Sequence, residues 1–239
     1  MGVNSGIAKK LGIVKQVDAV KIAIDNKKKQ NYLNQRTKYF CVGSNKTGTT
    51  SLARAFKNEG FIVGNQREAE LLTEDYFKGD FKKILKYCKT AEAFQDVPFS
   101  WPDTYKKLDK NFSNAKFILT VRDSSDQWYN SVVNFHAKIF GKGKIPNWEL
   151  LKNTEYVYRG WAHEIIQKLY NLTLNDDPYD KEVLIDHYEK HNNDVLNYFK
   201  DRSEDLLVIN LSEKDAYQRF CNFIGVKSDK TEFPWENKT

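Results

Sequence analysis

The sequence predicts an α/β protein in which a parallel sheet of four or five strands is flanked by helices. Short apolar runs, rich in β-branched and aromatic residues, alternate with longer segments of helical periodicity. That alternation is typical of parallel sheets covered on both faces. One run is followed by a loop of small residues and then by a helical segment, over residues 38–58. The 239 residues suit one domain with a substantial core.

The individual elements follow from composition and period. Buried strands are expected at residues 38–42, 61–63, 91–95, 116–121 and 206–210. Helices are expected at residues 49–59, 68–77, 81–88, 100–112, 126–140, 156–172, 179–199 and 212–224. No repeat or low-complexity linker interrupts them, so we expect a single domain over residues 37–239.

Residues 1–30 predict a separate, basic amphipathic helix. Apolar residues recur at gaps of three and four from Ile7 to Ile24, and lysines occupy the opposite face. This segment carries +5 of the net charge of +6, so the rest of the chain is nearly neutral and a nucleic-acid partner is not expected. Two roles stay open for the helix: packing on the domain, or contact with a membrane surface or anionic partner.

The cysteines and the apolar segments bear on the compartment. The three cysteines are widely spaced and form no C-x-x-C or Cys/His cluster, which argues against a disulfide framework or a zinc site. We see neither a signal-peptide pattern nor an apolar segment long enough to span a bilayer. We therefore expect a cytoplasmic protein, peripheral to a membrane if the N-terminal helix binds one.

The segment 38–52 organises the predicted site. A strand, a loop of small residues and a helix N-terminus form an anion-binding site, because backbone N–H groups converge there and the helix dipole favours negative charge. Gly43 and Gly48 have the spacing of the Walker A pattern, G-x-x-x-x-G-K-[ST]. However, Thr49 stands at the lysine position of that pattern, and the lysine lies inside the loop as Lys46.

The sequence Lys-Thr-Gly-Thr-Thr at residues 46–50 resembles the 5′-phosphosulfate loop of sulfotransferases that use 3′-phosphoadenosine 5′-phosphosulfate (PAPS). In that family an arginine at the end of a later strand and a serine on the following helix grip the 3′-phosphate. Arg122 and Ser131 match those roles, but they are nine residues apart where the family usually has eight, so Arg122 is the firmer match. The resemblance runs from about Lys38 to the C-terminus and implies a P-loop NTPase-like fold of the sulfotransferase type.

The resemblance implies transfer of the sulfuryl group from PAPS to a hydroxyl or amine acceptor, with adenosine 3′,5′-bisphosphate as the product and no metal required. Lys46 would stabilise charge on the bridging and leaving oxygens. The 5′-phosphate would be held by backbone N–H groups and hydroxyls of the loop and the first helical turn: Thr47, Gly48, Thr49, Thr50 and Ser51. The acceptor is expected to be a small molecule, a glycan or a lipid headgroup.

The general base has two candidates. Asp96 follows a predicted strand, at the edge where parallel-sheet sites form, and its carboxylate can take the acceptor proton. An equally simple role for Asp96 is to cap the turn that follows it. His136 is the alternative base. His187 and His191 lie one helical turn apart, but with no third ligand evident we expect structural or acceptor-site roles for them.

Two other classes of function stay open. A nucleotide or small-molecule kinase would share the fold, although the displaced lysine counts against it. A non-catalytic nucleotide-binding module would bind the nucleotide product and turn nothing over. The aromatic residues of the 156–199 region fit a sugar, a phenol or a lipid headgroup equally well.

Overall fold

The computed structural model describes residue 25 and residues 27–234. The chain divides into two units at the boundary between Arg36 and Thr37. In the first unit residues 27–35 are helical. The rest of the predicted basic helix, including all of the apolar stripe from Ile7 to Ile24, lies outside the described residues. Its packing or membrane contact therefore stays a prediction.

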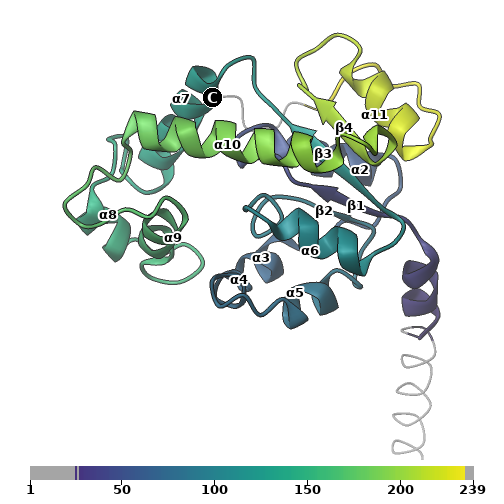
Figure 1. Ribbon diagram of the computed structural model, residues 1–239, viewed down its shortest axis with the longest axis horizontal. Helices are drawn as coiled ribbons and strands as arrows, with labels where there is room; N and C mark the ends of the chain where they lie inside the picture. Colours follow the sequence, from purple (N-terminus) through teal and green to yellow (C-terminus); the bar gives the residue numbers. More distant parts are fainter. Residues whose placement is uncertain (1–24, 26, 235–239) are drawn as a thin grey trace, which may run out of the picture. The chain divides into compact units, whose positions relative to one another are not determined.

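The second unit contains a parallel sheet, which confirms the predicted fold (Figure 1). Its strands are β1 (Lys38–Cys41), β2 (Ala93–Phe94), β3 (Ala115–Thr120) and β4 (Leu206–Ile209). Their order across the sheet is β2-β1-β3-β4, and each neighbouring pair is parallel. The strand expected at residues 61–63 is reduced to a single bridge between Val63 and Ala93.

Helices cover both faces of the sheet. They are α2 (Thr49–Asn58), α3 (Gln66–Glu70), α4 (Thr73–Phe77), α5 (Lys82–Tyr87), α6 (Thr104–Asn111), α7 (Ser125–Ile139), α8 (Trp148–Asn153), α9 (Trp161–Leu169), α10 (Lys181–Phe199) and α11 (Ala216–Ile224). A short 3₁₀ helix, Ser203–Asp205, precedes β4. Side chains of Ser124 and Asp180 cap the first turns of α7 and α10 by accepting hydrogen bonds from backbone N–H groups.

The alternation of side chains along the strands builds two cores. Phe40 and Phe117 are fully buried on one face, where they pack with residues of α5, α6 and the C-terminal half of α10. Tyr39 and Ile118 lie on the other face, with residues of α2 and α11. Because successive strand side chains point to opposite faces, burial of both sets requires helices on both sides.

The region 153–160 differs from the sequence prediction. A helix was expected from residue 156, but α9 begins only at Trp161, and the unpredicted helix α8 precedes it. Gly160 has a left-handed conformation (φ 82°), and a Cβ there would lie 3.2 Å from the Lys152 carbonyl oxygen. This bend replaces the expected first turns of α9 and leaves Tyr156 in the connection between α8 and α9.

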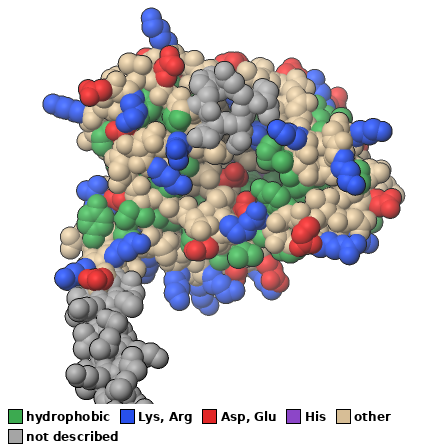
Figure 2. All heavy atoms as spheres, turned by 180° about the vertical axis from the view of Figure 1, so that it is seen from behind, with side chains coloured by type: hydrophobic (Ala, Val, Ile, Leu, Met, Phe, Trp, Pro, Cys, Tyr) green, Lys and Arg blue, Asp and Glu red, His purple; other side chains and the backbone are tan. Residues whose placement is uncertain are grey.

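The molecular surface carries mixed charge. Figure 2 shows lysine and arginine side chains interspersed with carboxylates across the face that it presents. Among the described residues no helix is long and apolar enough to cross a membrane. The expectation that nucleic acid is not a partner stays a prediction.

Candidate active site

The loop between β1 and α2 lies against the end of β3. A Cβ on Gly43 would come within 2.2 Å of the Thr120 hydroxyl, so glycine permits this close approach. Thr47 is buried, and its hydroxyl contacts the Ser44 carbonyl and the Thr120 hydroxyl, each at 2.5 Å. The Thr47 N–H also donates to the Ser44 carbonyl, at 3.3 Å. Thr47 therefore holds the loop in shape.

Two left-handed residues bend the loop over the start of α2. Lys46 has a φ of 67°, and Gly48, which directly precedes the helix, has a φ of 101°. The ammonium group of Lys46 lies 3.7 Å from the centroid of the Phe135 ring of α7. Burial lowers the pKa of Lys46, and the negative charge of Asp96 partly opposes this. The N–H groups of a first helical turn have no acceptor within the helix, so an anion is favoured at this N-terminus.

Arg122 joins the second predicted motif to the loop. Its Nε donates to the Lys46 carbonyl at 2.7 Å, and its backbone N–H donates to the Tyr188 hydroxyl at 3.1 Å. Trp128 gives further support, because its indole N–H donates to the Asn45 carbonyl and its ring stacks on Tyr188 at 4.5 Å. The two motifs, far apart in sequence, are thus one connected structure.

A cavity of about 300 Å³ brings most of the predicted site residues together. Its lining includes Lys46, Gly48, Thr49, Thr50, Ser51, Asp96, Arg122 and His136. Thr47 is not part of this lining. Ser131 is also absent from it, and lies on α7 one turn before Phe135. The role predicted for Ser131 at a 3′-phosphate stays a prediction.

Asp96 lies two residues after the end of β2 and has a left-handed backbone (φ 60°). Its Oδ1 accepts a hydrogen bond from the Val97 N–H at 2.9 Å, so the turn-capping role is present in the structure. Burial nevertheless raises the pKa of Asp96, against the smaller opposing effects of that hydrogen bond and of Lys46. A carboxylate with a raised pKa is a better proton acceptor than an exposed one.

His136 lies on the same cavity but in a different electrostatic state. Burial, with a further contribution from the positive charge of Lys46, lowers its pKa to about 3. Its Nδ1 is 3.0 Å from the Tyr179 hydroxyl. The imidazole is therefore neutral at physiological pH, and it is a much weaker base than an unperturbed histidine.

Three further cavity residues are Glu70 of α3, Tyr156 before α9 and Trp161 at the start of α9. The sequence analysis did not identify Glu70, and it considered the other two only as part of the aromatic region 156–199. Glu70 is 6% exposed and pairs with Arg67 at 2.8 Å. Burial and the nearby charge of Asp96 raise the pKa of Glu70. In the sequence, nothing in spacing or composition separates Glu70 from the neighbouring surface carboxylate Glu68.

The histidines of α10 have structural surroundings. His191 is buried, and its Nε2 lies 2.7 Å from the Val42 carbonyl oxygen at the end of β1. His187 packs edge-on against Tyr170. Across residues 27–234, no group of three or more His, Cys, Asp or Glu side chains is arranged to hold a metal ion.

A parallel α/β sheet whose strands lead into an anion-binding loop defines a class of group-transfer and nucleotide-binding proteins. Comparison with family models is more specific: a model described as the sulfotransferase domain matches residues 38–239. The chain therefore belongs to the sulfotransferase family, which confirms the resemblance found in the sequence. A search of curated proteins gives no match.

Proposed function

We propose that this protein transfers a sulfuryl group from PAPS to a hydroxyl group of an acceptor bound in the same cavity. The observation that carries the proposal is the hydrogen bond from Arg122 Nε to the Lys46 carbonyl, at 2.7 Å. This hydrogen bond connects the loop that binds the 5′-phosphosulfate in the family to the arginine that binds the 3′-phosphate. Two cationic side chains and a helix N-terminus then line one end of a single cavity.

The donor end of the cavity suits a phosphosulfate. The first turn of α2 offers backbone N–H groups and the hydroxyls of Thr49 and Thr50 to phosphate oxygens. Lys46 suits the sulfuryl and bridging oxygens, because a partly buried ammonium interacts more strongly with an anion than an exposed one does. Arg122 can give a forked, charge-assisted contact to the 3′-phosphate, with Ser131 as a neutral donor.

In the proposed reaction the acceptor oxygen forms a bond to sulfur while the bond between sulfur and the phosphate oxygen breaks. The proton of the acceptor hydroxyl passes to the Asp96 carboxylate, and the phosphate leaves with the electron pair of the broken bond. Lys46 stabilises the charge that develops on the leaving oxygen. As in phosphoryl transfer, positioning and electrostatics supply most of the rate enhancement.

Asp96 is a better candidate for the base than His136. Burial raises the pKa of the aspartate, whereas burial and Lys46 lower the pKa of the histidine to about 3. Since base strength follows pKa, the same cavity favours proton transfer to the carboxylate. Hydrogen bonds from the Val97 N–H and from the Thr49 hydroxyl then orient the carboxylate, which keeps further lone pairs for the proton of the acceptor.

Calorimetric titration with adenosine 3′,5′-bisphosphate, beside ATP with Mg²⁺, tests the donor class. We expect metal-independent binding of the bisphosphate, followed by turnover when PAPS and an acceptor are supplied. Binding of ATP alone, and only with Mg²⁺, would overturn the proposal and favour a kinase. Binding of the bisphosphate without turnover across a broad acceptor screen would indicate a non-catalytic module.

A further inference from the structure

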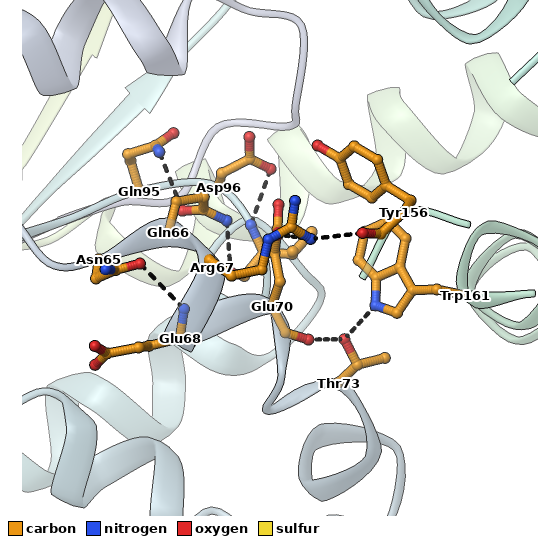
Figure 3. Close-up of polar contacts among 11 residues, drawn as sticks. Asn65, Gln66, Arg67, Glu68, Glu70, Thr73, Gln95, Asp96, Tyr156 and Trp161 are labelled. Carbon is orange, nitrogen blue, oxygen red and sulfur yellow. Dashed lines mark hydrogen bonds and ion pairs between the residues drawn. The ribbon is translucent and has the colours of Figure 1, made fainter. Parts of the chain in front are cut away.

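The end of the cavity away from the loop has a distinct chemistry, which Figure 3 displays. Glu70 and Asp96 both line it, and they approach closely enough for the charge of Asp96 to act on Glu70. The Gln95 Oε1 atom is buried and has no hydrogen-bond partner among the described residues. All of these oxygens accept hydrogen bonds. Glu70 pairs with Arg67 and Asp96 accepts from Val97, so the unpartnered Gln95 oxygen and the remaining lone pairs of the two carboxylates favour a ligand that donates hydrogen bonds.

The rings of Tyr156 and Trp161 form an aromatic wall of the same cavity. The guanidinium of Arg67, on α3, donates a hydrogen bond to the Tyr156 carbonyl at 3.3 Å. The same guanidinium lies 4.8 Å from the centroid of the Tyr156 ring. The Trp161 indole N–H donates to the Thr73 hydroxyl at 3.1 Å. That hydroxyl donates to the Glu70 carbonyl at 2.6 Å. Tyr156 and Trp161 are therefore linked to α3, the helix that carries Glu70, before a ligand binds.

The charges at this end disfavour an acidic ligand. Lys46 and Arg122 are the lysine and arginine among the described lining residues, and both belong to the donor end. Arg67 pairs with Glu70 but is about half exposed and is not part of the lining. Arg67 is already paired with Glu70, and the charge of Lys46 acts on Asp96, so a carboxylate or sulfate group on an acceptor would face two carboxylates whose neighbouring cations are already engaged.

The cavity continues into an open groove of about 540 Å³ beside α2. Thr50, Gln66 and Gln95 line both spaces. The groove adds one more amide, Asn65, together with the cations Arg54 and Lys57. Amide side chains both donate and accept, which matches hydroxyl groups. The two cations disfavour a positively charged ligand in this extension, so an amine is a poorer fit than a polyol.

We propose that the acceptor is a neutral, polyhydroxylated ring, either a sugar or a cyclitol, that lies between the Glu70 and Asp96 carboxylates and the rings of Tyr156 and Trp161. Neighbouring hydroxyls donate to the two carboxylates, and the apolar face of the ring lies on the aromatic wall. The hydroxyl on Asp96 receives the sulfuryl group. A longer saccharide continues into the groove. This inference rests on the proposed function and specifies its acceptor.

A transfer assay with sulfur-labelled PAPS tests the inference. The acceptors are methyl glucoside, methyl galactoside, methyl mannoside and myo-inositol as neutral rings, with methyl glucuronide and ethanolamine as charged competitors. We expect at least one neutral ring to be sulfated, and the glycosides against inositol distinguish a sugar from a cyclitol. The glucuronide is expected to have a KM about tenfold higher or more than its neutral counterpart, because like charges oppose its binding.

Glu70→Gln isolates the contribution of the carboxylate. It is expected to raise the KM of the neutral ring about 10- to 100-fold and to leave bisphosphate affinity unchanged. The difference in KM between the neutral ring and the glucuronide should become smaller. Glu68→Gln is the matched control, because Glu68 lies on the same helix, is exposed, and points away from Asp96 and Tyr156 (Figure 3). We expect no change in that variant.

The outcomes separate the two proposals. If the bisphosphate binds but no neutral ring is sulfated, or if the glucuronide or ethanolamine is preferred, the acceptor inference is wrong while the donor class stands. If Glu70→Gln behaves like Glu68→Gln, Glu70 does not bind the acceptor and the inference also falls. If the bisphosphate itself does not bind, the proposed function has failed first.

Discussion

The two ends of the cavity are built in different ways. The proposed donor end is lined by Asn45, Lys46 and residues 48–51, which belong to one continuous segment, together with Arg122. Backbone atoms hold it in place: the carbonyls of Lys46 and Asn45 accept hydrogen bonds from Arg122 and from Trp128. The acceptor end is assembled from α3, the residues after β2 and the connection before α9, which are joined largely through side chains.

This difference suggests that the two ends respond differently to change. The donor loop follows β1 directly, and its shape depends on φ angles and on backbone contacts with the sheet. Altering it disturbs the framework of the site. The acceptor end can exchange side chains such as Glu70 or Tyr156 without moving a strand. We therefore expect substitutions at the donor end to weaken donor binding and catalysis, and those at the acceptor end to alter selectivity.

Asp96 lies where the two ends meet, and its substitution should have the largest effect. Asp96→Asn keeps an acceptor oxygen for the Val97 N–H but removes the base. We expect kcat to fall by about 10²- to 10⁴-fold, the usual contribution of a general base, with little change in bisphosphate affinity. Steady-state transfer kinetics and calorimetry measure the two quantities.

The chain offers a close control for that variant. Asp103 has the same left-handed backbone (φ 59° against 60°), but it pairs with Lys106 at the surface and does not line the cavity. Asp103→Asn is expected to leave kcat unchanged. If Asp96→Asn keeps near-normal kcat, the proton goes elsewhere, and the division between the two ends must be redrawn.

Lys46→Ala removes the cation of the donor end. Because the lysine is proposed to stabilise charge that develops in the transition state, we expect kcat/KM to fall about 10²- to 10³-fold. Lys138 is a matched control: it is exposed on α7, and its charge acts on Lys46 from outside the cavity. Lys138→Ala should retain activity, and equal losses in both variants would mean that net charge rather than position matters.

Arg122→Ala tests the contact between the two motifs. Loss of charge-assisted hydrogen bonds is expected to weaken bisphosphate binding about 10- to 100-fold. Arg122→Lys keeps the charge but lacks Nε, so it cannot reproduce the contact with the Lys46 carbonyl and should bind with intermediate affinity. If both variants bind like the original protein, Arg122 supports the loop but does not contact the ligand.

The strand, loop and helix start at the proposed donor end could be predicted from the sequence for a physical reason. A strand, a loop with glycine at fixed positions and a helix start are local features, and their chemistry follows from their order along the chain. Long apolar segments such as residues 116–121 likewise identified the central strands. The two-residue strand β2 was also expected, although over a longer range.

The acceptor end could not be predicted in this way. Glu70 becomes a cavity residue only because α3 packs beside the end of β2, a tertiary contact that leaves no periodic pattern. Tyr156 enters the cavity because the left-handed Gly160 delays the start of α9, whereas the helical spacing alone predicted an earlier start. The buried state that raises the pKa of both carboxylates is likewise a property of the assembled fold.

The pH dependence of kcat/KM tests which residue is the base, and it carries the smallest expected effect. The base must be deprotonated, so activity is lost as pH falls through its pKa. Burial raises the pKa of Asp96, which puts the acid limb above the ordinary aspartate value of about 3.9. A limb set by His136 would instead lie at about pH 3.

His136→Gln and Glu70→Gln should both keep the limb at the higher pH. Its loss in His136→Gln would transfer the role of base to the histidine. Loss of the limb in Glu70→Gln would indicate that Glu70, and not Asp96, accepts the proton.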